Sequence, residues 1–72
     1  MAAQQKQTPA GVFIVSYSYV DTAGQQHTVE EQVIGYSSKN AISIIRQYLS
    51  ECNYLETKIL DVKLLDKIMV IG

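Results

Sequence analysis

The chain has 72 residues, with six Lys plus Arg against seven Asp plus Glu and a formal net charge of −1. A chain of this length forms one domain with only about 3–5 kcal/mol of stability unless a staple is added. One Cys and one His exclude an intrachain disulfide, a Cys-based zinc site and a His cluster. The near-neutral charge argues against a phosphate-binding surface, which is normally basic. We therefore expect no metal and no cofactor, and oligomerisation as the remaining source of stability.

The N-terminal ten residues carry no periodic pattern and contain three Gln. We predict a flexible leader over residues 1–10 and a single domain over residues 11–72. The start of the chain lacks the apolar core of a signal peptide, and no stretch approaches the roughly 20 apolar residues of a membrane span. With the lone cysteine, this predicts a cytoplasmic protein that does not bind a membrane.

Two strands and a tight turn are predicted first. Val12–Val20 is rich in β-branched and aromatic residues, which favours a strand. The residues of Asp21–Gly24 suit a type I turn, and Gly24 can take the positive φ that fits such a turn into a hairpin. The returning strand is His27–Tyr36. This loop fixes a register in which Tyr19 faces His27, Tyr17 faces Val29, Val15 faces Glu31 and Phe13 faces Val33.

The hairpin then has one apolar face, formed by Phe13, Val15, Tyr17, Tyr19, Val29 and Val33. Glu31 falls on this face, so either the strand bulges near it or its carboxylate emerges at the sheet edge. The opposite face is mostly polar, with Val12, Ile14 and Ile34 gathered at one end.

Ser37–Asn53 is the only stretch with clean helical periodicity. Its apolar positions include Ala41, Ile45 and Leu49, spaced as on one helix face, and Ser37 suits the N-cap. The helix should lie on the apolar face of the hairpin. The opposite, solvated side of the helix carries the side chains that we predict to contact a partner: Lys39, Ser43, Arg46, Gln47 and Ser50.

Glu56–Leu65 alternates again, with Leu60, Val62 and Leu64 on one face and Ile59 and Leu65 on the other. Ile68–Ile71 forms either a short fourth strand after a tight hairpin or the end of one long, kinked strand. The fold class predicted is α+β: a small, antiparallel-rich sheet of three to four strands in ββαβ or ββαββ order, with one helix packed on one face.

One helix covers only one face of such a sheet, and monomers rarely leave a large apolar patch uncovered. Three occupants compete for the second face: the chain's own C-terminal tail, a second copy, or a different protein. We predict a homodimer whose interface comprises Val12, Ile14, Ile34, Ile59, Leu65, Ile68 and Val70.

No pattern of catalytic residues is present. His27 and Glu31 would lie about 13 Å apart along a strand, too far to bind one metal ion. Glu30 and Glu31 point to opposite faces. Cys52 continues the apolar side of the helix and is best explained as a buried thiol. Because no glycine-rich phosphate loop or nucleophile motif occurs either, we predict that the protein is not an enzyme.

The D-x-x-G turn, the segment G-Y-S-x-x-x-A and the strand E-T-K-I-L-D-V-K-L-L resemble those of small phage-encoded accessory proteins. Some anti-CRISPR inhibitors are similar in having a strand-strand-helix-strand plan. The resemblance spans residues 12–65. It implies a non-enzymatic protein that occupies another macromolecule's surface, in the cytoplasm of a bacterial host. The chain departs from nucleic-acid-mimicking inhibitors, which are strongly acidic.

Two functional hypotheses follow. The first is a homodimeric protein-interaction module, a phage-type inhibitor or regulator, whose unidentified protein partner binds the solvated helix face or the open sheet face. The alternative is a nucleic-acid-binding module that uses Lys58, Lys63 and Lys67 with the open sheet face. The alternative predicts binding that weakens steeply with salt, and the net charge disfavours it.

Overall fold

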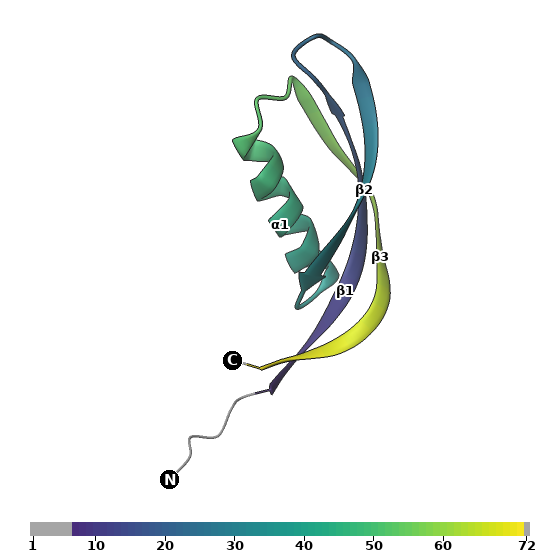
Figure 1. The fold of residues 1–72 in the computed structure, drawn as a ribbon, viewed down its shortest axis with the longest axis vertical. Helices are drawn as coiled ribbons and strands as arrows, with labels where there is room; N and C mark the ends of the chain where they lie inside the picture. Colours follow the sequence, from purple (N-terminus) through teal and green to yellow (C-terminus); the bar gives the residue numbers. More distant parts are fainter. Residues whose placement is uncertain (1–6, 72) are drawn as a thin grey trace.

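The structure is a computed structural model that describes residues 7–71. Within that range the elements are β1 (Gln7–Val20), β2 (Gln26–Gly35), α1 (Ser38–Glu51) and β3 (Glu56–Ile71). The strands form one antiparallel sheet in the order β2-β1-β3, and α1 lies along one face of it (Figure 1). The predicted α+β class and ββαβ order are confirmed.

The hairpin of β1 and β2 has the predicted register, with Tyr19 opposite His27 and Phe13 opposite Val33. Asp21 holds the turn together: its Oδ1 accepts hydrogen bonds from the backbone N–H groups of Ala23 and Gln25, at 3.0 and 2.9 Å. Gly24 has a φ of 85°, in the left-handed region that favours glycine. The turn chemistry therefore fixes the register, as turn type does in hairpins generally.

β3 is one long strand, so the fourth strand does not form, and the tail does not fold over the open face. Its residues 68–71 pair with residues 7–10 of β1 instead. Residues 7–10 therefore belong to the sheet, which corrects the predicted leader; its residues 1–6 lie outside the described part. Because β2 ends at Gly35, opposite Gly11, β1 and β3 continue past it as a two-stranded arm (Figure 1).

β3 contains two bulges where it pairs with β1. The register skips one residue of β3 between Tyr17 and Ser16 and another between Phe13 and Val12; the skipped residues are Leu60 and Leu65. A bulge shifts the alternation of side chains by one position.

The bulge at Leu60 places Ile59 on a different face of the sheet from the one predicted. Without it, Ile59 and Val62 would point to opposite faces, as the simple alternation predicted. With it, Ile59 pairs with Tyr17 and packs against the core beneath the helix. Ile59 is therefore absent from the open face, where the proposed dimer interface had placed it.

The core lies between α1 and the centre of the sheet. Ser37 caps the helix, since its Oγ accepts a hydrogen bond from the Asn40 N–H at 3.0 Å. The helix then buries Ala41, Ile45 and Leu49 against a set of sheet residues comprising Phe13, Val15, Tyr17 and Val33. Burial of each such aliphatic or aromatic side chain contributes about 1.5–3 kcal/mol. No helix of residues 7–71 lies on the opposite face of the sheet.

Candidate interaction surfaces

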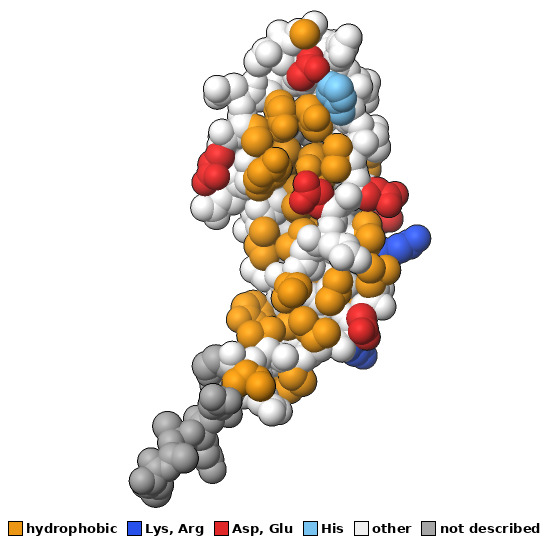
Figure 2. Space-filling view, viewed as in Figure 1, with side chains coloured by type: hydrophobic (Ala, Val, Ile, Leu, Met, Phe, Trp, Pro, Cys, Tyr) orange, Lys and Arg blue, Asp and Glu red, His pale blue; other side chains and the backbone are white. Residues whose placement is uncertain are grey.

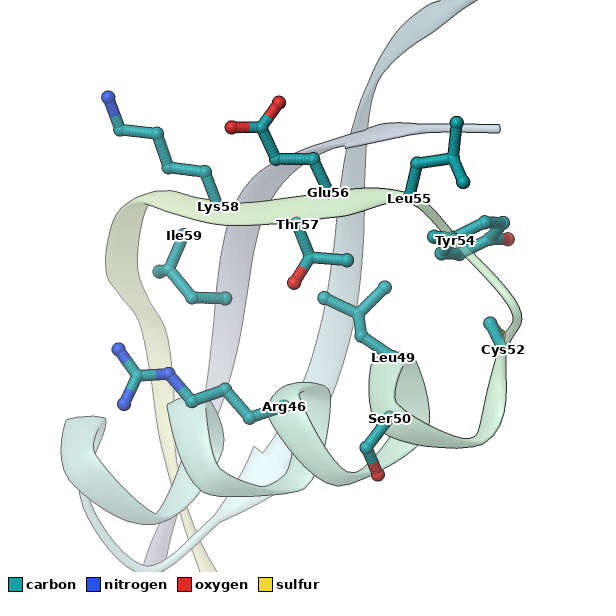
Figure 3. Close-up of a pocket in the computed structure, with 10 residues that line it drawn as sticks. All are labelled: Arg46, Leu49, Ser50, Cys52, Tyr54, Leu55, Glu56, Thr57, Lys58 and Ile59. Atoms are coloured by element: carbon teal, nitrogen blue, oxygen red, sulfur yellow. The ribbon is translucent and has the colours of Figure 1, made fainter. Parts of the chain in front are cut away.

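The solvated helix face is present as predicted: Lys39, Ser43, Arg46, Gln47 and Ser50 are all exposed. Two of them, Arg46 and Ser50, also border a groove of about 610 Å³ between α1 and the start of β3. In Figure 3, Thr57 and Ile59 project from β3 toward the helix, whereas Lys58 projects away from it. The groove thus combines aliphatic side chains with polar ones and with both charge signs, since Glu56 and Lys58 border it as well as Arg46.

The open sheet face has an apolar end and a polar remainder. Val12, Ile14, Ile34 and Leu65 lie at the end nearest the arm. The arm continues this face with Ile68 and Val70, which are half-buried. Apart from Ile59, the residues predicted for the dimer interface therefore share one side of the molecule. In the view of Figure 2, hydrophobic side chains occupy much of the visible surface of the molecule.

The three lysines of the nucleic-acid hypothesis do not form one patch. Lys58 pairs with Ser18 and Lys63 with Ile14, on the open face, but Lys67 pairs with Gly11 and lies on the helix side. The same open face carries more acidic than basic side chains. The basic side chains on this face are Lys58 and Lys63, and the acidic ones are Glu30, Glu56, Asp61 and Asp66. A polyanion would therefore meet a surface with net negative charge, which further disfavours this hypothesis.

A second groove, which the sequence reasoning missed, lies on the helix side where the arm leaves the domain. It has a volume of about 390 Å³ and is lined chiefly by Phe13, Tyr36, Leu64 and Met69. The sequence shows that Ile68–Ile71 is apolar, but it does not show that this segment pairs with residues 7–10 and so forms one wall of the groove. Local pattern does not reveal that pairing, because the two segments stand at opposite ends of the chain.

His27 belongs to a structural cluster at the hairpin end. Its ring stacks on Tyr19, with centroids 4.8 Å apart, and Tyr19 stacks in turn on Tyr54 at 3.9 Å. The His27 Nε2 lies 2.7 Å from the Asp21 Oδ2, and this hydrogen bond is the main reason that the pKa of the Asp21 carboxyl is lowered. Within residues 7–71 no three potential metal-ligating side chains gather.

The Asp21 carboxylate should make the hairpin end sensitive to acid. Because its pKa is lowered from 3.8 by folding, the stability it contributes is present above about pH 4 and is lost as pH falls below that. We expect Asp21→Asn to lower the thermal unfolding midpoint at pH 6, and to differ less from the native chain near pH 3, where protonation of the native carboxylate begins to remove its contribution. A matched control is Glu51→Gln on the exposed helix end. Curves for Asp21→Asn that stay equally far apart at both pH values would contradict this role.

Glu31 falls on the apolar face of the hairpin, on a strand at the edge of the sheet. The β1–β2 register is uninterrupted, so the strand does not bulge, and β2 is an edge strand. The Tyr17 hydroxyl donates a hydrogen bond to the Glu31 Oε1 at 3.1 Å. Burial, and then this carboxylate, raise the pKa of Tyr17. Cys52 is partly buried, and its Sγ donates to the Tyr48 carbonyl at 3.5 Å.

No helix within residues 7–71 has the length and apolar character needed to cross a membrane. Comparisons with models of protein families, with curated proteins and with solved structures find no match. The resemblance to small phage-encoded proteins therefore extends to the ββαβ order of elements and no further.

Proposed function

We propose that this protein is a small, non-enzymatic interaction module that self-associates as a homodimer and occupies a surface of another protein. The observation that carries the proposal is the exposure of large hydrophobic side chains. Within the described residues, ten of them are between 41% and 67% exposed: Ile34, Tyr36, Ile44, Tyr48, Leu55, Leu60, Leu64, Leu65, Met69 and Ile71. Single exposed hydrophobics are ordinary, but so many on so small a domain are typical of binding surfaces.

The exposed residues support two separate contacts. One lies along β3 and would serve a second copy of the chain. The other comprises the groove between α1 and β3, with Arg46 at its rim, and would serve a different protein. The resemblance to small phage-encoded proteins adds the proposal that this partner is inhibited or regulated in a bacterial cytoplasm.

The self-association is tested by sedimentation equilibrium over a wide range of concentrations. The chain has a mass of 8.0 kDa, and we expect the measured mass to approach twice that value as concentration rises. A mass that stays at 8.0 kDa throughout would contradict the homodimer.

The second contact is tested by affinity capture from cell extract with matched variants. We expect a protein that is retained by the native chain and by Lys39→Glu, and lost on Arg46→Glu, because Arg46 borders the groove and Lys39 does not. Retention by both variants would exclude this groove as the binding site. Salt-dependent capture of RNA or DNA in place of a protein would favour the alternative function.

A further inference from the structure

Among the described residues, no strand pairs with the outer edge of β3. β3 spans 16 residues and pairs only with β1 among the described strands. Half of the ten exposed large hydrophobic side chains belong to it: Leu60, Leu64, Leu65, Met69 and Ile71. A long edge strand with exposed hydrophobic side chains is a template for pairing with another strand, whereas charged side chains and bulges, which β3 also contains, are among the features that restrict such pairing.

Five charged side chains of β3 lie on the open face of the sheet: Glu56, Lys58, Asp61, Lys63 and Asp66. Lys58, Asp61, Lys63 and Asp66 pair with Ser18, Ser16, Ile14 and Val12, which alternate regularly along β1 and so share the open face. Their spacing along β3 is irregular. In an unbulged strand, Lys58 would point away from the face of Asp61, and Lys63 away from the face of Asp66. The bulges at Leu60 and Leu65 fall in these two intervals and bring all four onto one face.

The order of four of these charges is self-complementary. Lys58 and Asp66 are equally far from Val62 along the chain, and so are Asp61 and Lys63. Reading β3 backward through Val62 therefore exchanges Lys58 with Asp66 and Asp61 with Lys63, whereas Lys67 falls opposite Thr57 and Glu56 opposite Ile68. Leu60 and Leu64 are also equally far from Val62 along the chain and about half exposed, although Leu60 is a bulge residue and Leu64 pairs with Phe13. A strand with this pattern is complementary to an antiparallel copy of itself.

We infer that two copies of the chain pair antiparallel through their β3 edges, about a two-fold axis at Val62, and form one continuous sheet. Each Lys58 then stands opposite an Asp66 of the second copy, and each Asp61 opposite a Lys63. Opposite charges facing each other across antiparallel strands stabilise the pairing. The two-fold axis is perpendicular to the sheet, so both helices lie on the same side. This inference rests on the proposed self-association and specifies its edge and register.

The same charges disfavour neighbouring registers. A slip of two residues moves the axis to Asp61 or to Lys63. Asp61 would then face Asp61 of the second copy, or Lys63 would face Lys63. Like charges directly opposite are destabilising, so the pattern selects one register from those that the apolar residues alone would permit.

Charge inversion tests the inference. Asp61→Lys gives a chain with Lys at both central positions, and Lys63→Asp gives one with Asp at both. We expect each variant alone to dimerise at least about tenfold more weakly than the native chain, because like charges meet twice at the axis. An equimolar mixture should form a heterodimer with near-native affinity, and the double variant Asp61→Lys/Lys63→Asp should recover the homodimer. Sedimentation equilibrium and native mass spectrometry measure all four.

Two matched controls make the same charge changes on the exposed side of α1: Glu51→Lys and Lys39→Asp. These should dimerise like the native chain. Because Asp61 and Lys63 are both exposed, the variants should remain folded, which circular dichroism verifies. If two variants that dimerise weakly by themselves form a heterodimer when mixed, the inference is supported, because mixing could not repair damage to the fold.

Two results would overturn the inference in different ways. Native-like dimers of both single variants would show that self-association uses another surface, and the proposed function would stand. A native chain that stays monomeric at every concentration would overturn both the edge pairing and the proposed homodimer.

Discussion

Replacing Ile45 with Ala is expected to leave much of the chain unfolded at 25 °C. Ile45 is 2% exposed at the centre of α1, between Ala41 and Leu49, and belongs to the core over the middle of the sheet. Removing the buried methylenes of such a residue costs about 2–5 kcal/mol, because the site collapses only partly. A domain of this length has about 3–5 kcal/mol in total. Urea unfolding followed by circular dichroism, at a fixed protein concentration, measures the loss.

The matched control for Ile45 is its neighbour Ile44, which is 41% exposed on the same helix. Ile44→Ala removes the same atoms and leaves the same helix propensity, so the difference between the two variants isolates burial. We expect Ile44→Ala to cost less than about 1 kcal/mol. Equal losses from the two variants would mean that α1 does not bind the sheet through the face described above.

Phe13→Ala is the second substitution expected to have a large effect. Phe13 is 5% exposed, and its ring extends from the core toward the arm, where it lines the groove with Leu64 and Met69. Its truncation should cost about 3–5 kcal/mol and leave a cavity at the base of the arm. The ring also fills the space beside Gly11, where an added Cβ would lie 2.9 Å from it. Thermal unfolding of the purified chain measures the loss.

Tyr36→Ala provides the comparison, since Tyr36 is an aromatic residue on the same groove but is 61% exposed. We expect it to change stability by less than about 0.5 kcal/mol, as surface substitutions usually do. If Tyr36→Ala proved as damaging as Phe13→Ala, the groove would be part of a buried interface and not a surface of the monomer.

Several features of the fold followed from local sequence. The residues of Asp21–Gly24 predicted the turn, the turn predicted the register of the hairpin, and Ser37 predicted the start of the helix. Each of these depends on neighbours a few positions away along the chain. The same local reasoning predicted which helix side would be solvated, because a period of 3.6 residues separates the two sides unambiguously.

The tertiary structure decided what happens along β3. Glu56–Leu65 fits a regular strand, and nothing local marks Leu60 or Leu65 as a bulge. The bulges become visible only in the pairing with β1, where Ile59 and Val62 both pack against the core beneath α1. That pairing also placed residues 7–10 in the sheet and moved Lys67 away from Lys58 and Lys63. Local sequence was enough to predict the turn, the hairpin register and the helix, because turn and helix signals are local. Only the packed structure determined the face of each β3 side chain, because a period of two residues is reversed by every bulge.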